Sequence, residues 1–477
     1  MPVRGLDRLI HVNNRSTAIG AVRRRLRLGP DHPGYVEAIL CSGARVLASG
    51  ATFAALALTL GGGHFTIAAL AALPYVMRLS HLGMPELVRR FDSGRVARAS
   101  TWLERGGFLL AALCAIVRPE HWTIPGFLVG FAVGVLGQSM YDGSMASLHS
   151  EANAAEVYGR YTALKSRWGS AAGLVLGVLA SIVLDGSERL GVPAHIARAL
   201  AVTGGVLVHL VIAFPLRQLR LRARMVSSLT SGDSADENGL PTPTTPNGAV
   251  AAQRSWLVLP RTPEQWKLVR FAVAWGFALG FSTRQGEAMA LTRLGVSIGG
   301  LTLLNALAVG GGIVGAKSWG QLGDRFGGKG LMSIAFAGLS LDPLWWLAAL
   351  YLNPAFLIIG YLLFGICNSG WNITVSMTLV RTAGAGSERI RAFVVYSVAF
   401  GLAAGLAPML SGALLEVMDA RYGATAAYGA LFIIALMLRF SAYPWLRRVP
   451  APQAERGGYV SAVVLRAMRW RMRRSAA

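Results

Sequence analysis

The chain has 477 residues, of which 53% are hydrophobic and only 14% are charged, and its mean hydropathy is +0.48. A soluble chain carries about a quarter charged residues, so this apolar excess excludes one soluble core and predicts a chain that uses lipid as its solvent. The formal net charge of +23 falls in the segments between apolar runs rather than on one soluble face, so we expect a lipid bilayer and no nucleic acid as partner.

The N-terminal residues 1–34 form a basic, acid-poor arm that lacks the apolar core of a signal peptide. Its arginines directly before the first apolar run are Arg23, Arg24, Arg25 and Arg27. This composition is shared by transit peptides and by cytoplasmic arms that lie on anionic lipid. Because the first span follows at once, we favour the cytoplasmic arm.

Six apolar runs follow, each long enough to cross a hydrocarbon core of about 30 Å. They lie near residues 36–60, 64–82, 101–118, 122–146, 162–184 and 195–215. We therefore predict an N-terminal six-helix bundle over residues 35–216.

A polar stretch then separates this group from a second one. Residues 217–265 are rich in Ser, Thr, Pro and Asn, which cannot support a packed core, so they are predicted to be a partly disordered cytoplasmic linker. The second group of apolar runs lies near residues 266–290, 296–318, 329–351, 354–380, 389–416 and 424–446. The prediction is an all-α polytopic membrane protein of about 12 transmembrane helices in two pseudo-symmetric six-helix bundles, the second over residues 266–446.

Basic side chains mark alternate loops of this arrangement. They are Arg89, Arg90, Arg95 and Arg98, then Arg160, Lys165 and Arg167, then Arg325 and Lys329, then Arg381, Arg389 and Arg391. The remaining loops are short and poor in charge or of mixed sign. By the positive-inside rule both termini are cytoplasmic, and we expect an integral protein of a bacterial inner (plasma) membrane. The basic tail, residues 447–477, fits either an anionic membrane surface or a partner-binding helix.

The two groups share sequence. Residues 169–174 (GSAAGL) in the fifth run recur as residues 401–406 (GLAAGL) in the eleventh, an offset of 401 − 169 = 232. Tyr141-Asp142 corresponds in the same order to Trp371-Asn372. Duplicated halves around a site at mid-membrane are typical of transporters.

The loop at residues 320–329 (GQLGDRFGGK) resembles the signature loop of the major facilitator superfamily. Its glycines allow a tight turn, and its Asp can pair with an Arg or cap a helix. The corresponding residues 85–95 of the first half keep Arg90 but carry Arg89 where the signature has Asp. The residues assigned to gating loops are Arg90, Gly320, Asp324, Arg325, Lys329 and Arg381. We hypothesise that Asp324 pairs with Arg381 or caps the fifth span in an outward-facing state, and a purely structural loop is the alternative.

The resemblance implies two bundles that rock about a central site formed mainly by the first, fourth, seventh and tenth spans. A charge at mid-membrane costs about 2.5–3.5 kcal/mol on insertion scales, so each one there requires a partner or a task. Glu37 and Arg45 lie in the first span and Asp142 in the fourth. We hypothesise that Arg45 and Asp142 interact and face the cavity as an ion pair, a proton-sensitive gate or an anchor for charged substrate. An inert structural pair, or side chains that reach the cytoplasmic end, is the alternative.

Three further groups complete the predicted cavity. Asn368, Trp371 and Asn372 share one helix face in the tenth span, and amides beside an aromatic ring suit a polar organic solute, although interhelical hydrogen bonding would use the same groups. Gln138, Tyr141 and Asp142 repeat this geometry in the fourth span. Arg284, Gln285 and Glu287 end the seventh span, either as an outer gate or as an interfacial Arg–Glu pair.

The remaining chemistry argues against an enzyme. Cys41, Cys114 and Cys367 have no CxxC spacing, which predicts no disulfide framework and no metal site. The chain has no HExxH, GxSxG or P-loop motif, so we expect no cofactor and no catalytic residue. We predict secondary-active or facilitative transport of a small solute by a monomer. A proton is the default coupling ion, with Glu37 and Asp142 as candidate carriers, and a transporter-like sensor or assembly factor without flux is the alternative.

Overall fold

A computed structural model describes residues 32–48, 50–117, 122–152, 155–232, 262–282, 284–326, 328–382 and 387–449. Every regular element in these ranges is a helix. The first half contains α2 (Pro33–Leu47), α3 (Gly50–Thr59), α4 (His64–Val76), the 3-10 helix η1 (Met77–Leu82), α5 (Met84–Phe91), α6 (Ser93–Val117), α7 (Thr123–Ala152), α8 (Ala155–Arg189), α9 (Ala194–Leu210) and α10 (Ala213–Gly232). The second half contains α11 (Pro263–Gly280), α12 (Gln285–Thr292), α13 (Ile298–Phe326), α14 (Gly328–Ser340), α15 (Asp342–Tyr351), α16 (Phe356–Thr382), α17 (Ser387–Tyr422), α18 (Ala424–Ser441) and α19 (Tyr443–Arg448).

Prolines and caps account for several helix ends. Pro33 opens α2, where the His32 side chain accepts a hydrogen bond from the Gly34 backbone N–H at 3.1 Å. Thr262 caps α11 by accepting from the Gln265 N–H at 3.2 Å. Both devices satisfy donors that a helix start leaves unpaired. Pro74 lies inside α4 and removes one helical hydrogen bond, and three residues later the chain continues as the 3-10 helix η1.

Eleven segments of the described chain are long and apolar enough to cross a membrane. The predicted span at residues 266–290 is absent from this set, and as a continuous helix that prediction is wrong. α11 ends at Gly280, and Arg284 has a φ of 67°, a left-handed conformation that a right-handed helix cannot contain. The pair α11 and α12 therefore supplies the twelfth segment as two pieces.

The helix α10 extends beyond its predicted end. It continues to Gly232, so residues 217–232 of the predicted linker are helical. On this extension the Arg220 Nη2 lies 2.5 Å from the Asp92 Oδ2, at the turn between α5 and α6. This ion pair ties the end of α10 to the first bundle.

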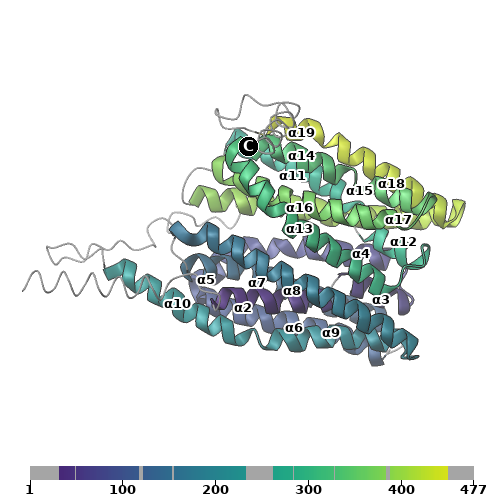
Figure 1. The fold of residues 1–477 in the computed structure, drawn as a ribbon, viewed down its shortest axis with the longest axis horizontal. Coiled ribbons are helices and arrows are strands. Elements are labelled where there is room, and N and C mark those ends of the chain that lie inside the picture. Colours follow the sequence, from purple (N-terminus) through teal and green to yellow (C-terminus); the bar gives the residue numbers. More distant parts are fainter. Residues whose placement is uncertain are drawn as a thin grey trace, which may run out of the picture.

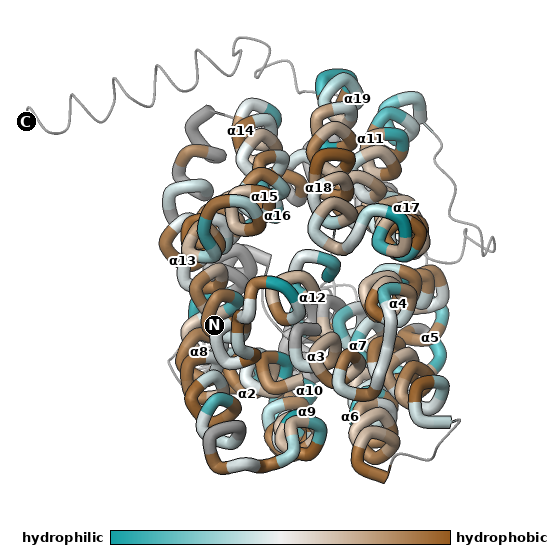
Figure 2. The backbone as a smooth tube through the Cα atoms, turned by 90° about the vertical axis from the view of Figure 1, so that its right-hand side faces the viewer, coloured by the Kyte–Doolittle hydropathy of each residue, from teal (hydrophilic) through white to brown (hydrophobic). Residues whose placement is uncertain are grey.

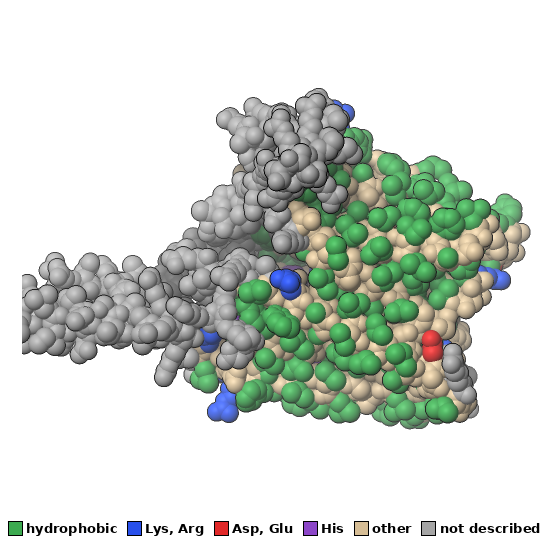
Figure 3. All heavy atoms as spheres, in the orientation of Figure 1, with side chains coloured by type: hydrophobic (Ala, Val, Ile, Leu, Met, Phe, Trp, Pro, Cys, Tyr) green, Lys and Arg blue, Asp and Glu red, His purple; other side chains and the backbone are tan. Residues whose placement is uncertain are grey.

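The helices form two layers, with α2–α10 in one and α11–α19 in the other (Figure 1). A view turned by 90° shows α12 between the two groups, beside α3 (Figure 2), and α12 contacts both α3 and α4. The bundles meet where α8 packs on α13 and α4 packs on α17. Apolar side chains spread across the outer face of both layers with few charged ones between them (Figure 3), as expected of a surface in contact with lipid. The fold is that of two six-segment bundles.

The two ends of the molecule differ in what they contain. We name the end where α10 finishes at Gly232 and α11 begins at Pro263 the linker end, and the opposite end, which contains α12 and the turn between α8 and α9, the far end. In Figure 1 the linker end is on the left and the far end on the right.

Candidate functional site

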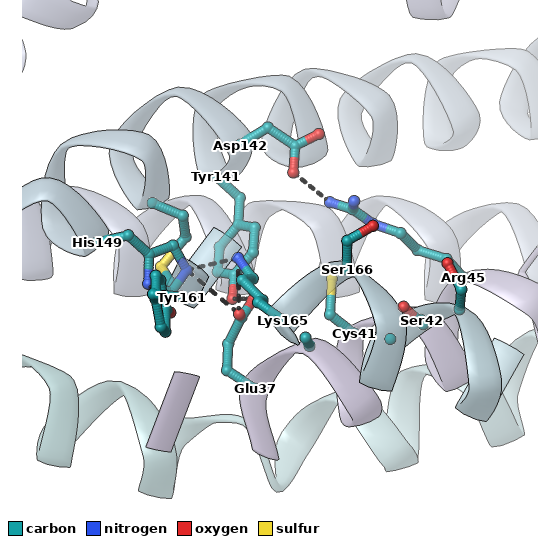
Figure 4. A pocket seen from close by; sticks show the side chains of 14 residues that line it. Glu37, Cys41, Ser42, Arg45, Tyr141, Asp142, His149, Tyr161, Lys165 and Ser166 are labelled. Carbon is teal, nitrogen blue, oxygen red and sulfur yellow. Dashed lines mark hydrogen bonds and ion pairs between the residues drawn. The ribbon is translucent and has the colours of Figure 1, made fainter. Parts of the chain in front are cut away.

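A cavity of about 420 Å³ lies within the first bundle between α2, α7 and α8 (Figure 4). We name it cavity 1. Its polar lining consists of Glu37, Ser42, Arg45, Tyr141, Asp142, His149, Tyr161, Lys165, Ser166 and Ser170. Because α2 and α8 begin at the linker end and α7 finishes there, this cavity belongs to the linker end of the molecule.

Glu37 is the centre of a polar network in cavity 1. Its side chain is only 2% exposed. The Tyr141 hydroxyl donates to the Glu37 Oε1 at 2.7 Å, and the Lys165 Nζ lies 3.1 Å from the Glu37 Oε2. A buried carboxylate without a counter-charge would be costly, so this ammonium and this hydroxyl hold Glu37 in its ionised form.

His149 completes this network from the end of α7. Its Nε2 lies 2.5 Å from the Lys165 Nζ, and its Nδ1 lies 2.7 Å from the Tyr161 hydroxyl. Burial lowers the pKa of His149 below its ordinary value, the Glu37 carboxylate, whose Oε2 lies 3.4 Å from the His149 Nε2, opposes this shift, and the charge of Lys165 adds to it. A neutral ring fits the geometry, since its Nε2 lone pair can accept from the ammonium while its Nδ1–H donates to Tyr161.

Arg45 and Asp142 form a second ion pair on the wall of the same cavity. The Arg45 Nη2 donates to the Asp142 Oδ1 at 2.6 Å (Figure 4). The Asp142 side chain is 51% exposed, so this pair borders solvent-accessible space rather than the packed interior. The predicted interaction between Arg45 of α2 and Asp142 of α7 is therefore present in the structure.

A second cavity of about 500 Å³, named cavity 2, continues from cavity 1 and reaches the other bundle. The two cavities share Ser42, Arg45, Gly169 and Ser170. The second bundle contributes Arg284, Thr302, Asn305, Ala306 and Val309 to its lining. Arg284 and Arg45 thus reach one space from different bundles.

Arg284 owes its position to the break between α11 and α12. Its left-handed backbone starts α12, and its Nη1 donates to both carboxylate oxygens of Glu287 at 2.7 Å. The predicted Arg–Glu pair is therefore present, and its Arg284 lines cavity 2 between the bundles. Gln285, between them, is fully buried.

The predicted polar faces of the fourth and tenth spans are placed differently. Gln138 lines cavity 2, and Tyr141 lines cavity 1. Trp371 instead packs in the core of the second bundle, with ring centroids 5.7 Å from Phe271 and 5.2 Å from Trp275. Asn368 and Asn372 line neither of the two cavities. The corresponding residues of the fourth and tenth spans therefore lie in different environments, although their sequence spacing is the same.

The residues assigned to gating loops are only partly described. Arg90 pairs with Glu86 one helical turn earlier, Nε to Oε1 at 2.5 Å. The Lys329 Nζ donates to the carbonyl oxygens of Arg447 and Val449 at 3.0 and 2.6 Å, which ties α14 to the end of α19. The side chains of Gly320, Asp324, Arg325 and Arg381 lie outside the described residues.

The bundles also contact each other at the far end. The His64 Nε2 at the start of α4 lies 3.1 Å from the Asp419 Oδ2 near the end of α17. The Asp185 Oδ1 of α8 accepts from the Gly299 backbone N–H in the first turn of α13 at 3.1 Å. These two contacts join the bundles at the end opposite cavity 1.

Lys165, His149 and Tyr161 are site residues that the sequence pattern does not predict. Lys165 is predicted to lie in a loop, whereas α8 already begins at Ala155 and carries Tyr161 and Lys165 on successive turns. One signal was available, because 161 and 165 are four residues apart and so share a helix face. Glu104 and His209, buried inside the first bundle, were also missed although both lie in predicted spans.

The described residues contain no group of three or more His, Cys, Asp or Glu side chains that could hold a metal ion. The arrangement instead offers paired charges around a space large enough for a small organic molecule. Such a site can bind and orient a solute.

Residues 286–475 match the family model described as Major Facilitator Superfamily. No curated protein sequence matches the chain. Among solved structures, a variant of the nucleoside transporter NupG has a TM-score of 0.62 at 11% identity and covers 87% of this chain and 98% of its own. The xylose transporter XylE from E. coli, in an inward open conformation, has the same TM-score and identity and covers 90% and 98%. A bacterial homologue of the iron transporter ferroportin, in an inward-facing state, has a TM-score of 0.57 at 15% identity and covers 87% and 98%.

At these identities the structural matches establish the fold alone. The family match to the second half and the fold of the whole chain together confirm the resemblance to the major facilitator superfamily, and they support transport of a solute across a membrane.

Proposed function

We propose that this chain, with its major facilitator fold, carries a small solute with an anionic group across the membrane by alternating access. The observation that carries this proposal is the lining of the joined cavities. Arg45, Lys165 and Arg284 line them with three cationic groups, and each has a carboxylate partner, which is Asp142, Glu37 or Glu287 respectively. A solute anion between Arg45 and Arg284 would meet the guanidinium N–H groups of both, and the low-dielectric wall strengthens that attraction.

Arg45 and Arg284 are the residues best placed to hold this anion. They come from α2 and from the start of α12, so an anion between them would contact both bundles. A guanidinium binds a planar carboxylate or a phosphate through two parallel hydrogen bonds. Ser42, Thr302 and Asn305 on the same wall can hydrogen-bond the uncharged part of the solute.

The charge pattern of the loops indicates which side of the membrane the cavity faces. The positive-inside rule supports a cytoplasmic location for the linker end and for both termini. Cavity 2, between the bundles, then adjoins cavity 1 on its cytoplasmic side, while the far-end contacts hold the bundles together on the outside, which is the arrangement of an inward-facing state. On this proposal residues 35–216 and 266–446 are the rocking units, and residues 217–265 form the cytoplasmic connection that joins them.

Flux into proteoliposomes tests this function. The purified protein is reconstituted into vesicles that are loaded with one member of a library of small carboxylates, phosphates and neutral polyols. Exchange of the labelled compound is then measured, with protein-free vesicles as the control. We expect exchange of at least one anion, with a loss of about tenfold or more in Arg45→Gln and in Arg284→Gln, because each removes a charge-assisted pair worth about 1.5–3 kcal/mol. Arg90→Gln, which changes an exposed pair on α5, is the matched control.

Two outcomes would contradict the proposal. Exchange confined to neutral polyols would refute the anionic solute, and equal exchange in the two arginine variants and the wild type would refute the site. Binding of an anion without any exchange would favour the transporter-like sensor or assembly factor.

A further inference from the structure

A second polar cluster lies deeper in the first bundle, behind the cavity wall. Glu104 of α6 and His209 of α9 are 1% and 3% exposed, and the His209 Nδ1 lies 3.8 Å from the Glu104 Oε2. Within the described part of the chain, four atoms of this cluster are buried and have no hydrogen-bond partner. These atoms are the Glu104 Oε2, the Arg105 Nε, the His209 Nε2 and the Arg45 Nε.

Close helix packing holds Glu104 in this position. A Cβ at Gly137 of α7 would lie 2.7 Å from the Glu104 Cα and 2.8 Å from the Ser100 carbonyl oxygen. α6 and α7 can therefore approach this closely only because residue 137 is glycine. The short separation leaves the carboxyl group of Glu104 enclosed by protein.

The neighbouring Arg105 does not satisfy the free oxygen of Glu104. Its Nη2 donates to the His209 backbone carbonyl, and its guanidinium lies 5.2 Å from the ring centroid of Trp102. An ionised carboxylate with an unpaired oxygen is strongly unfavourable in such a place, so either a proton or a cation must satisfy it.

Arg45 is the cation that connects this cluster to cavity 1. Arg45, Glu104, Arg105 and His209 line one small void, and the Nη2 of the same Arg45 is bound by Asp142 on the cavity side. The charged or titratable groups that surround Glu104 are Arg45 and Cys41 on α2, Tyr141 and Asp142 on α7, His209 on α9 and Arg105 on α6. Arg45 therefore lies between a buried carboxyl and an exposed one.

We propose that Glu104 is a proton-binding site and that Arg45 transmits its state to the cavity. While Glu104 carries its proton, Arg45 pairs with Asp142, as in this structure. When that proton leaves to the water of the cavity, Arg45 turns to the new carboxylate, and the cavity loses one cation. The inference rests on the proposed function, since it identifies the coupling site of the same transporter.

This exchange of partners couples the proton to the anion. Arg45 is available to a solute anion only while Glu104 is protonated, so the two should bind together, and each should raise the affinity for the other by the same factor. Movement of both in one cycle is symport of an anion with a proton. The charges of Glu37 and Lys165 take no part, because these two groups neutralise each other in cavity 1.

An infrared titration of the purified protein tests the proton site without any solute. We expect the carbonyl stretch of a protonated carboxyl group to grow as the pH falls, and this band to be missing from Glu104→Gln. Asp142→Asn frees Arg45 for Glu104 and should move the titration midpoint of the band to lower pH by about one unit, or tenfold in proton affinity. Arg45→Gln should move the midpoint to higher pH, and Glu86→Gln on α5 should leave it unchanged.

A band of equal size in Glu104→Gln would overturn the site, and so would equal midpoints in Asp142→Asn and the wild type. Because Asp142 is exposed, its variant should fold even if a change at Glu104 does not. Flux separates this inference from the proposed function. Glu104→Gln should keep anion exchange but lose accumulation driven by a pH gradient, whereas a wild type without flux but with the predicted midpoints would refute transport and leave the proton site standing.

Discussion

At the scale of single residues, the cavity depends on charges that neutralise each other. Glu37 is almost completely buried, and the Lys165 that faces it is 25% exposed. In such a pair the exposed partner loses less hydration than the buried one, so most of the desolvation cost is carried by Glu37. Removing the charge of Lys165 should therefore lower the free energy of unfolding by more than the partial exposure of Lys165 suggests.

Lys165→Met tests this reasoning. The variant keeps the length of the side chain but leaves Glu37 as an uncompensated buried charge, so we expect a loss of about 3 kcal/mol in the free energy of unfolding. The measurement is chemical or thermal unfolding in detergent. Lys165→Arg, which keeps the charge, should lose far less, and equal stability of the two variants would show that the charge of residue 165 does not hold Glu37.

The sequence allowed predictions about charged residues within the membrane spans, because such residues are rare there. Arg45 and Asp142 could be paired in advance because a charge in a span demands a partner. Trp371 could not be placed, because an aromatic residue on a polar-looking helix face satisfies a packed core equally well, and here it packs on Trp275. Lys165 and His149 were missed because the positive-inside pattern explains a basic residue near a loop without any further role.

At the scale of helices, the spacing of α6 and α7 is set by glycines. Glu104 is brought to its enclosed position by Gly137, whereas Gly106, two residues along α6, has no atom near the place where its Cβ would be. The two positions lie in the same pair of helices and differ in what faces them, which makes them a matched pair.

Gly137→Ala should force α6 and α7 apart, because backbone atoms cannot move aside as a flexible side chain can. We expect a loss of about 1–3 kcal/mol in stability, as for other overpacked sites. Gly106→Ala should be neutral or should stabilise by up to about 1 kcal/mol, since alanine is the better helix former. Unfolding midpoints of both variants measure this, and a Gly137→Ala protein as stable as Gly106→Ala would contradict the close packing.

Most helices could be predicted from apolar runs alone, but their interruptions could not. The break between α11 and α12 follows from the left-handed backbone of Arg284, and no proline or pair of glycines announces it in residues 281–284. The extension of α10 past residue 217 was missed for the opposite reason. A basic residue such as Arg220 is typical of a polar linker, and the sequence does not show that Arg220 forms an ion pair with Asp92.

At the scale of the whole molecule, the two bundles are held together unevenly. The far end has the His64–Asp419 pair and the Asp185 contact to α13, whereas cavity 1 occupies the linker end. The loop at residues 320–329 predicts a contact from Asp324 that would close the linker end in the opposite state, and the side chain of Asp324 lies outside the described residues. Alternating access requires the far-end contacts to open during each cycle.

A reversible cross-link across the far end tests that requirement most directly. Cysteines replace His64 and Asp419 after Cys41, Cys114 and Cys367 are removed, and a short cleavable bis-thiol reagent joins them in proteoliposomes. We predict that anion exchange stops when the reagent is added and returns when it is cleaved, while either single-cysteine protein is unaffected. Exchange that continues at its full rate with the bundles joined at the far end would contradict alternating access.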